Sequence, residues 1–265
     1  MPEPSPIPDV SVFPISQATR ATFTELYFKY TCLIFIQVGS KRVLCPVNGE
    51  MIGNTDEVMV FPPGAIVTLE NRPVLNSGYR AIGVCFSHSM VKAVFSTQKR
   101  GAKPFGIQIL QLGSDPVLQI LDSVQNTLKD ENLPESIRQH RLLEPLIWLK
   151  HHGVQLAPHE DENPLSKVRR LIETDLSHSW RSSEVAEYFS ISESTMRRWL
   201  AKSGQGFAKT LQNTRLEHGL SLLQSTDIPI SDIALDCGFK TPSHFSDSFR
   251  KRFGIKPSEI RNVEN

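Results

Sequence analysis

The chain has 265 residues, of which 39% are hydrophobic and 22% charged, and its formal net charge is +1 at pH 7. This composition is typical of a folded protein of about two domains and excludes a disordered or fibrous chain. No apolar run approaches about 18 residues, so no membrane-spanning helix is expected. The first residues, MPEPSPIPDVSVFP, lack the basic and apolar regions of a secretory signal peptide, so we expect a cytoplasmic location.

Residues 10–113 carry the pattern of short β-strands. TCLIFIQVGSKRVLCPV (31–47) predicts two strands around a Gly-Ser turn, and VMVFPPGAIVTLEN (58–71) predicts strand, turn and strand. GYRAIGVCFSH (78–88) predicts a further strand. Short strands with closely spaced turns favour a small β-barrel or jelly roll.

A barrel of this size can enclose one small ligand. Apolar residues in these positions are more often ordinary core, and each of the cationic candidates is more often a surface charge. The candidate ligand-binding residues are Phe23, Tyr27, Lys29, Leu33, Phe35, Arg42 and Arg80. No histidine precedes His88, so the paired histidines of a barrel metal site are missing, and we expect no metal and no cofactor.

The four cysteines are Cys32, Cys45, Cys85 and Cys237. None of them forms a C-x-x-C pair, so neither a zinc site nor a redox motif is predicted. We expect four reduced, buried thiols.

Two helices are predicted after the strands, within 114–156. The first has an apolar stripe over 117–128 and the second over 137–149. These stripes could pack on the barrel or, within 116–149, join two copies in a homodimer. The polar segment 157–164, APHEDENP, predicts a linker, which separates a first domain at 1–156 from a second at 165–265.

The second domain begins with a helix-turn-helix pattern at 182–204, SSEVAEYFSISESTMRRWLAKSG. Ser182 or Ser183 is the expected cap of its first helix, and a break at Ile191–Ser192 follows. Ser192 is the expected cap of a second helix at 193–203. The outer face of this second helix carries Ser194, Thr195, Arg197, Arg198 and Lys202.

A second helix-turn-helix pattern occupies 227–254. Its first helix is expected to be capped from within Asp227–Ser231, and Gly238 ends it. Its second helix, 242–253, places Phe245, Phe249 and Phe253 on one face, with Thr241 as N-cap and Pro242 at the first helical position. The opposite face and the turn before it carry Lys240, Thr241, Ser243, His244, Asp247, Arg250 and Lys251.

The segment between the two patterns, GFAKTLQNTRLEHGLSLLQST (206–226), predicts one long helix with buried leucines and a buried Phe207. At about 1.5 Å per residue, roughly 18 residues span about 27 Å. With the flanking turns, this length could separate the two outer helices by about one turn of B-DNA, roughly 34 Å.

The basic residues of these helices favour DNA as the partner. Any one basic cluster is ordinarily a solvated face, but clusters at Arg197–Arg198 and at 250–252 occupy matching positions of two units. The two arginines of the first cluster are expected to read bases. Lys240, Arg250 and Lys251 are expected to hold phosphates.

Residues 165–261 resemble the C-terminal DNA-binding domain of the AraC/XylS family of bacterial transcription regulators. The stretches SSEVAEYFSISESTMRRWL, TRLEHGLSLLQSTDIPISDIALDCGF and PSHFSDSFRKRFGIKPSEIR carry this resemblance. Three positions depart from the family pattern: Asp247 stands where a basic residue is usual, Gly219 where alanine is common, and Ile260 where an aromatic is common. A glycine inside the long helix is expected to weaken it by about 1 kcal/mol.

The resemblance implies an α+β, two-domain chain. Its N-terminal domain would be a cupin-like β-barrel or jelly roll with two helices, and its C-terminal domain two helix-turn-helix units joined by a long linker helix. The implied function is promoter DNA binding, most often activation through RNA polymerase. In the branch that controls virulence genes in enteric bacteria, the resemblance implies fatty acids or other small host signals as effectors.

Other functions stay open at this level. The chain could be a DNA-binding regulator without a ligand that is controlled by a protein partner. It could also be a cupin-type enzyme, or a DNA-repair methyltransferase with an AraC-like module, which needs a cluster of zinc-binding cysteines. The scattered cysteines and the lack of an ordered catalytic set lead us to expect no enzyme activity.

Overall fold

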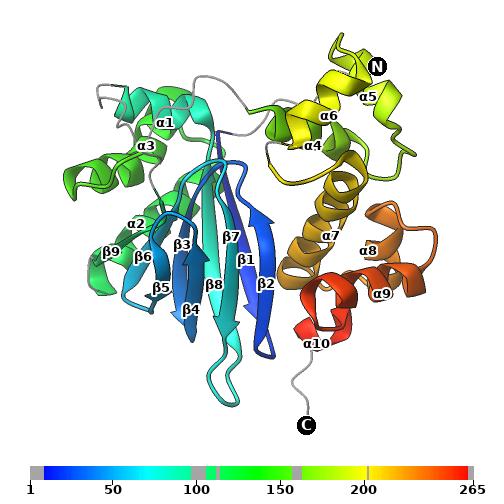
Figure 1. Ribbon diagram of the computed structural model, residues 1–265. Helices are drawn as coiled ribbons and strands as arrows, with labels where there is room; N and C mark the ends of the chain where they lie inside the picture. The colour runs from blue at the N-terminus through cyan, green and yellow to red at the C-terminus, as the bar shows by residue number, and fades with distance from the viewer. Residues whose placement is uncertain (1–8, 97–105, 112–113, 157–162, 202, 262–265) are drawn as a thin grey trace. The chain divides into compact units, whose positions relative to one another are not determined.

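The computed structural model describes residues 9–96, 106–111, 114–156, 163–201 and 203–261 (Figure 1). These residues form two compact units, which are divided in the sequence between residues 156 and 163. The first unit consists of β-strands and helices, and the second consists of helices alone.

Two antiparallel sheets make up the β part of the N-terminal unit. The strands are β1 (Val10–Gln17), β2 (Ala21–Tyr27), β3 (Thr31–Val38), β4 (Ser40–Cys45), β5 (Gly49–Gly53), β6 (Glu57–Phe61), β7 (Ile66–Arg72), β8 (Tyr79–Phe86) and β9 (Gln108–Gln111). One sheet has the order β1-β8-β3-β6-β9 and the other β2-β7-β4-β5. The expected barrel or jelly-roll architecture is therefore confirmed.

The turns predicted from the sequence carry the chain from one sheet to the other. Strands β3 and β4 meet at Gly39 but belong to different sheets, and the Pro-Pro-Gly turn likewise joins β6 to β7. Gly39 has φ +89°, and a Cβ there would overlap the carbonyl oxygen of Arg72. Only glycine fits this corner, because it tolerates positive φ and needs no side-chain space.

The two faces of the five-stranded sheet have different partners. Leu33 and Phe35 belong to a hydrophobic core that this sheet shares with the helices. Because side chains alternate along a strand, Ile36 points to the other face. There a Cβ on Gly53 of β5 would overlap the Met59 side chain and come within 3.3 Å of Ile36. This second face therefore packs against the four-stranded sheet.

Three described helices accompany the sheets in this unit, whereas two were expected. They are α1 (His88–Phe95), α2 (Ser114–Lys129) and α3 (Glu135–His151). The helix α1 was missed because its pattern is only eight residues long, although Ser87 accepts a hydrogen bond from the Met90 amide as a normal N-cap. Buried residues of α2 and α3, such as Val124 and Leu146, pack into the core beside the five-stranded sheet.

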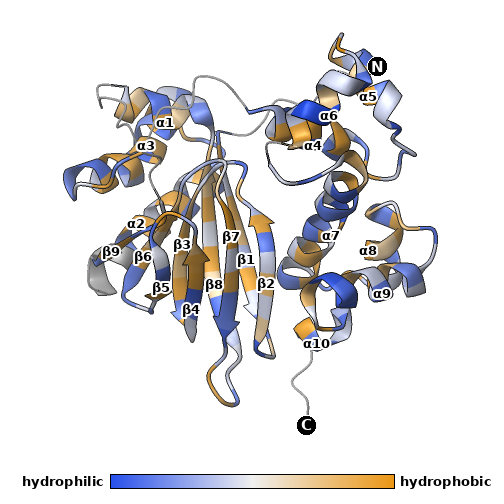
Figure 2. Ribbon diagram, in the orientation of Figure 1, coloured by the Kyte–Doolittle hydropathy of each residue, from blue (hydrophilic) through white to orange (hydrophobic). Residues whose placement is uncertain are grey.

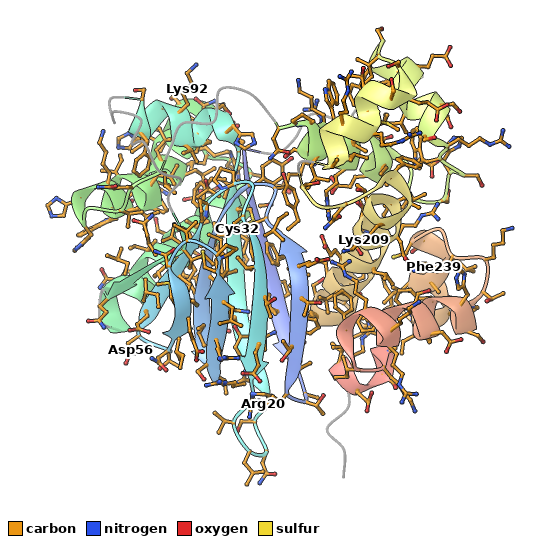
Figure 3. All side chains as sticks on the ribbon, viewed as in Figure 1. Arg20, Cys32, Asp56, Lys92, Lys209 and Phe239 are labelled. Atoms are coloured by element: carbon orange, nitrogen blue, oxygen red, sulfur yellow. A yellow bond between two sulfur atoms is a disulfide. The ribbon has the colours of Figure 1, made fainter. Side chains whose placement is uncertain are left out.

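The expectation of four reduced thiols is wrong for two cysteines. Cys32 and Cys85 form a disulfide, while Cys45 and Cys237 are free and buried. Cys32, which is labelled in Figure 3, is paired directly with Cys85 in the antiparallel register of β3 and β8. Facing positions bring two Cβ atoms within disulfide reach, and a sequence separation of 53 residues does not reveal that register.

The C-terminal unit contains seven described helices, as expected for two helix-turn-helix units on a long linker helix. They are α4 (Pro164–Thr174), α5 (Ser182–Tyr188), α6 (Glu193–Ala201), α7 (Phe207–Ser225), α8 (Ile230–Asp236), α9 (Pro242–Phe253) and α10 (Pro257–Arg261). Hydrophobic and hydrophilic residues alternate along them, as in amphipathic helices that share one core (Figure 2).

Two capping expectations and two burial expectations are wrong in this unit. Helices α5 and α8 start after Arg181 and Pro229 and have no side-chain cap. The hydroxyl of Ser182 instead donates to a carboxylate oxygen of Glu193 at 2.5 Å. Phe207 and Leu211 of α7 are half-buried rather than buried.

An ion-pair cluster joins three helices of the C-terminal unit. The Glu217 carboxylate of α7 accepts hydrogen bonds from Arg169 of α4 and from Arg252 of α9. Arg252 also donates to the backbone oxygen of Asn213 at 2.8 Å. Arg169 is only 3% exposed, so replacing Glu217 would remove the carboxylate that is paired with a buried charge.

Gly219 has a packing role that its helix propensity does not show. A Cβ at this position would lie 2.8 Å from the ring of Phe245 and 3.4 Å from the Cys237 sulfur. Phe245 is fully buried, so its ring has little room to move. The glycine therefore makes space for the large aromatic residue of α9.

We predict that Gly219→Ala lowers the free energy of unfolding. Overpacking costs about 1–3 kcal/mol and outweighs the gain of about 1 kcal/mol in helix propensity. Denaturant unfolding of Gly219→Ala, Phe245→Leu and the double variant measures the coupling. We expect the double variant to be more stable than the sum of the two single effects, and strict additivity would contradict this packing argument.

Candidate functional site

Helix α6 presents a polar and basic face. Its start is fixed by Ser192, whose hydroxyl oxygen accepts a hydrogen bond from the Thr195 amide at 3.2 Å, as expected. Met196 and Leu200 are buried, while Arg197 and Arg198 are exposed.

The remaining predicted DNA-binding residues of the first helix-turn-helix motif differ in their surroundings. Ser194 is exposed and Thr195 half-buried, and the Arg198 guanidinium donates to the Thr195 hydroxyl at 3.2 Å. Lys202 lies outside the described residues.

Helix α9 begins and ends as its sequence predicts. The Thr241 hydroxyl oxygen accepts a hydrogen bond from the His244 amide at 3.2 Å, and Pro242 follows the cap. Gly254 ends the helix with φ +73°. The cap and the stop fix which side chains of α9 share a face.

The three phenylalanines of α9 are buried as expected. Phe245 and Phe249 are 0% exposed, and Phe253 is 4% exposed. Their rings contact one another in sequence, with centroids 5.6 Å and 4.7 Å apart. All predicted DNA-binding residues of the second helix-turn-helix motif are exposed: Lys240, Thr241, Ser243, His244, Asp247, Arg250 and Lys251.

Helix α7 is the scaffold of both helix-turn-helix motifs of the C-terminal unit. Its 19 residues correspond to about 28 Å at a rise of about 1.5 Å per residue. Arg215 of α7 donates to the backbone oxygens of Leu176 and His178, at 2.9 Å and 2.8 Å. Together with the Glu217 ion pairs, these bonds hold α4, the loop after it and α9 against one rigid helix.

The candidate ligand-binding residues of the N-terminal unit do not converge on one surface. Phe23 is fully buried in the four-stranded sheet, whereas Leu33 and Phe35 lie in the core on the helix side of the other sheet. Arg42 forms a bidentate pair with Glu50 at 2.8 Å and 2.7 Å. Tyr27 and Lys29 are half-buried near the end of β2, and Arg80 is exposed on β8.

The structure reveals a buried polar cluster that the sequence analysis missed. Lys41 is 3% exposed; its ammonium donates to the Asn71 side-chain oxygen and lies 5.1 Å from the Tyr79 ring centroid. Asn71 donates to the Gln17 side-chain oxygen at 2.7 Å. The Tyr79 hydroxyl is buried and has no hydrogen-bond partner among the described residues.

Burial lowers the pKa of Lys41 to about 7, because the apolar surroundings disfavour the charged ammonium. One sequence signal could have located this lysine. Lys41, Val43 and Cys45 recur at a period of two along β4, and all three are buried. A lysine in phase with buried apolar residues is unusual, since lysine is almost never fully buried.

We predict that Lys41→Met raises the free energy of unfolding at pH 7. Between about pH 7 and pH 10.5 the unfolded chain holds a proton that the folded chain lacks, so the wild type gains stability as the pH rises. The advantage of the variant should therefore shrink toward pH 10.5, by up to about 1.4 kcal/mol per pH unit. Denaturant unfolding at several pH values measures the difference, and a constant difference would contradict the buried charge. Lys92→Met, at an exposed position of α1, controls for the substitution itself.

Neither metal-binding clusters nor membrane helices were found in the described part of the chain. No three His, Cys, Asp or Glu residues there come together as a metal site. None of the helices described is long and apolar enough to cross a membrane.

Burial raises the pKa of the Cys237 thiol to about 12, so this thiol stays protonated at neutral pH.

Comparison with known proteins identifies the class of the second unit. The family described as "Helix-turn-helix domain" matches residues 185–262. The HTH-type transcriptional activator CsvR of Escherichia coli is 34% identical over 96 residues, which cover 36% of each protein. The transcriptional regulator SirC of Salmonella typhimurium (strain SL1344) is 33% identical over 99 residues, covering 37% of this chain and 34% of SirC. The chain thus spans about a third of the length of the curated relatives it matches.

Solved structures extend the likeness of fold to both units. An apo, single-substitution variant of ToxT from Vibrio cholerae strain SCE256 has a TM-score of 0.68 and 14% identity, covering 94% of this chain and 95% of that one. Wild-type ToxT with a bound unsaturated fatty acid gives 0.67 and 14%, covering 94% and 93%. The C-terminal unit is a helix-turn-helix domain. This assignment rests on the match over residues 185–262.

Proposed function

We propose that this protein is a sequence-specific DNA-binding transcription regulator that reads two successive major grooves with α6 and α9. One observation carries the proposal. Each of these helices buries its apolar face and exposes a polar, basic one, and both belong to a domain organised around the single helix α7. A recognition helix needs this division, because its inner face must pack while its outer face meets the groove.

The residues on the two outer faces have different proposed roles. Arg197 and Arg198 would read bases in the first groove, since an arginine can donate two hydrogen bonds to guanine. Asp247 could accept a hydrogen bond from a cytosine amino group in the second groove. Lys240, Arg250 and Lys251 would hold phosphates and set the register. The further proposed DNA contacts are Ser194, Thr195, Lys202, Thr241, Ser243 and His244.

We predict that Arg198→Ala selectively weakens binding to DNA that the wild-type protein selects from a random pool. The expected loss is about 1–3 kcal/mol on selected DNA, with little change on random DNA. Lys251→Ala should instead weaken both and lower the slope of log K against log salt by about one unit. Fluorescence anisotropy over a range of salt concentrations measures both effects.

Lys92→Ala, in the N-terminal unit, is a control that should change neither affinity. An equal loss on selected and random DNA for Arg198→Ala would refute base reading by α6. Absence of any DNA binding by the wild type would refute the proposed function as a whole.

Activation through RNA polymerase in the cytoplasm is the regulatory mode we propose. It is supported by the relative CsvR, which is named a transcriptional activator. This proposal assigns no enzyme activity to the chain.

We further propose that the N-terminal unit senses a small carboxylate such as a fatty acid. ToxT, whose fold this chain shares, has been solved with an unsaturated fatty acid bound. In this chain the Lys41 ammonium and the Tyr79 hydroxyl provide buried donors beside Asn71. A carboxylate reaching them would compensate the buried charge of Lys41, since an opposite charge favours the ammonium form.

Native mass spectrometry of the purified protein, before and after organic extraction, tests this sensor role. We expect a discrete bound mass in the wild type that is absent from Lys41→Met. An empty wild-type protein would instead support a regulator without a ligand that is controlled by a protein partner. The same spectra report a homodimer through residues 116–149, which the exposed Ile147 and Trp148 of α3 favour.

A further inference from the structure

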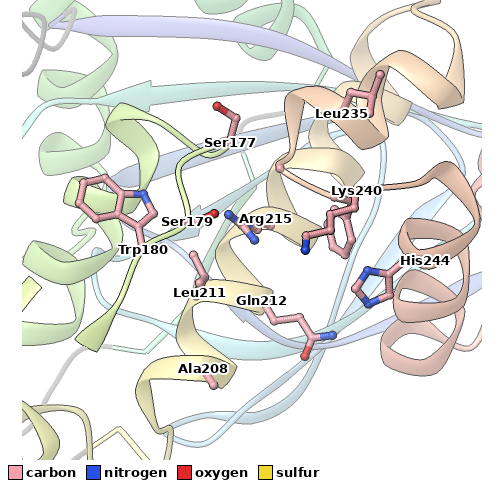
Figure 4. Close-up of a pocket in the computed structure, with 12 residues that line it drawn as sticks. Ser177, Ser179, Trp180, Ala208, Leu211, Gln212, Arg215, Leu235, Lys240 and His244 are labelled. Carbon is pink, nitrogen blue, oxygen red and sulfur yellow. The ribbon is translucent and has the colours of Figure 1, made fainter. Parts of the chain in front are cut away.

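A pocket of about 730 Å³ lies within the C-terminal unit (Figure 4). Its walls come from the loop between α4 and α5, from α7, and from the turn between α8 and α9. The pocket therefore touches the scaffold helix and the start of the second recognition helix together. Its volume lies within the range of about 300–1,000 Å³ that is typical of small-molecule sites.

Hydrogen bonds and close backbone packing hold the walls of this pocket in place. The Asp175 carboxylate accepts hydrogen bonds from the Ser177 amide and hydroxyl and from the His178 amide, at 2.9, 2.6 and 3.0 Å. The Trp180 indole donates to the Asp175 backbone oxygen at 2.7 Å. A Cβ on Gly238, which has φ +76°, would overlap the Leu176 carbonyl oxygen. Such contacts fix the loop between α4 and α5 against the turn between α8 and α9 and preorganise the pocket.

The lining combines an apolar body with basic groups. Trp180, Leu211 and Phe239 supply apolar and aromatic surface. Arg215, Lys240 and His244 supply the ionisable groups, and no Asp or Glu is among the described lining residues. Figure 4 shows the Lys240 and Arg215 side chains on the same opening, opposite Trp180. This set of groups complements an anion that carries an apolar or aromatic part.

The charge of Arg215 is not cancelled by its hydrogen bonds to the loop. These bonds go to two neutral carbonyl oxygens, of Leu176 and His178. Burial has the largest effect on the pKa of Arg215 and lowers it, while the fields of Cys237 and Asp175 raise it. A guanidinium bonded to neutral oxygens keeps its full charge available to a ligand anion.

We propose that this pocket binds a small amphipathic organic anion, such as an arylalkyl carboxylate, and that this ligand competes with DNA. The carboxylate lies among Arg215, Lys240 and His244, and the apolar body lies against Trp180, Leu211 and Phe239. Competition follows because Lys240 and His244 also belong to the proposed DNA-binding surface. This second part rests on the proposed function, whereas binding of the anion does not.

Trp180 provides a direct test in the full-length protein. The chain has three tryptophans, so Trp148→Phe with Trp199→Phe leaves Trp180 as the sole indole. The probe is 4-phenylbutanoate, which we expect to change Trp180 fluorescence saturably, and the neutral 4-phenylbutanamide is its matched control. Lys240→Gln should weaken binding of the acid by about tenfold, the effect of about 1.4 kcal/mol. Lys256→Gln, at an exposed lysine outside the pocket, should not change it.

Three results would overturn anion binding in this pocket. They are the absence of a saturable response to the acid, equal responses to acid and amide, and equal affinity in Lys240→Gln. A Trp180 response to DNA without any response to the acid would show that the basic groups serve DNA phosphates instead, and it would overturn the proposal as well.

The competition is tested with Ala208→Phe, which fills the pocket from α7 without changing Lys240 or His244. The acid should weaken DNA binding by the wild type and leave this variant unaffected. Equal sensitivity of the two proteins would refute competition through the pocket. If the protein binds no DNA even without the acid, the proposed function fails, while the Trp180 titration still decides whether the pocket takes an anion.

Discussion

The C-terminal unit depends on one buried electrostatic interaction, in which Glu217 of α7 is shared by Arg169 of α4 and Arg252 of α9. A carboxylate between two guanidinium groups joins α4 to α9. Arg215 adds the loop after α4 through two backbone oxygens. The orientation of α9 is therefore tied to α4 by a rigid helix rather than by flexible chain.

Close packing around α7 adds a steric constraint to this electrostatic one. Gly219 leaves space for the ring of Phe245. Gly238 lets the turn between α8 and α9 approach the backbone at Leu176. The bulky Phe245 opposite Gly219 thus explains a glycine at a position where alanine is common in the AraC/XylS pattern that the sequence resembles. The same closeness between loop and turn forms the walls of the pocket that holds Lys240 and His244. Any anion bound there would act at the place where the two parts of the domain meet.

The N-terminal unit also holds polar groups inside an apolar core. Burying Lys41 beside Asn71 and Tyr79 costs stability, because an ammonium loses its hydration there. Natural proteins commonly retain such costs at sites that bind or switch. The cluster is therefore the part of this unit that packing alone does not account for, and a carboxylate effector would account for it.

The sequence by itself determined those features that depend on neighbouring residues. The phenylalanine face of α9, its Thr241 cap and its Gly254 stop follow from helical periodicity and local hydrogen bonds, and so do the exposed arginines of α6. The two-domain order and the succession of strands were predictable for the same reason, as periods of two and 3.6 are local signals.

Only the tertiary structure decided what depends on register and on distant partners. The pairing of β3 with β8 placed Cys32 against Cys85, and the corner at Gly39 sent β3 and β4 to different sheets. The choice of face put Leu33 and Phe35 toward the helices and Lys41 into the interior. These outcomes follow from packing between segments far apart in the chain, because a side chain's surroundings are set by which elements meet and not by its sequence neighbours.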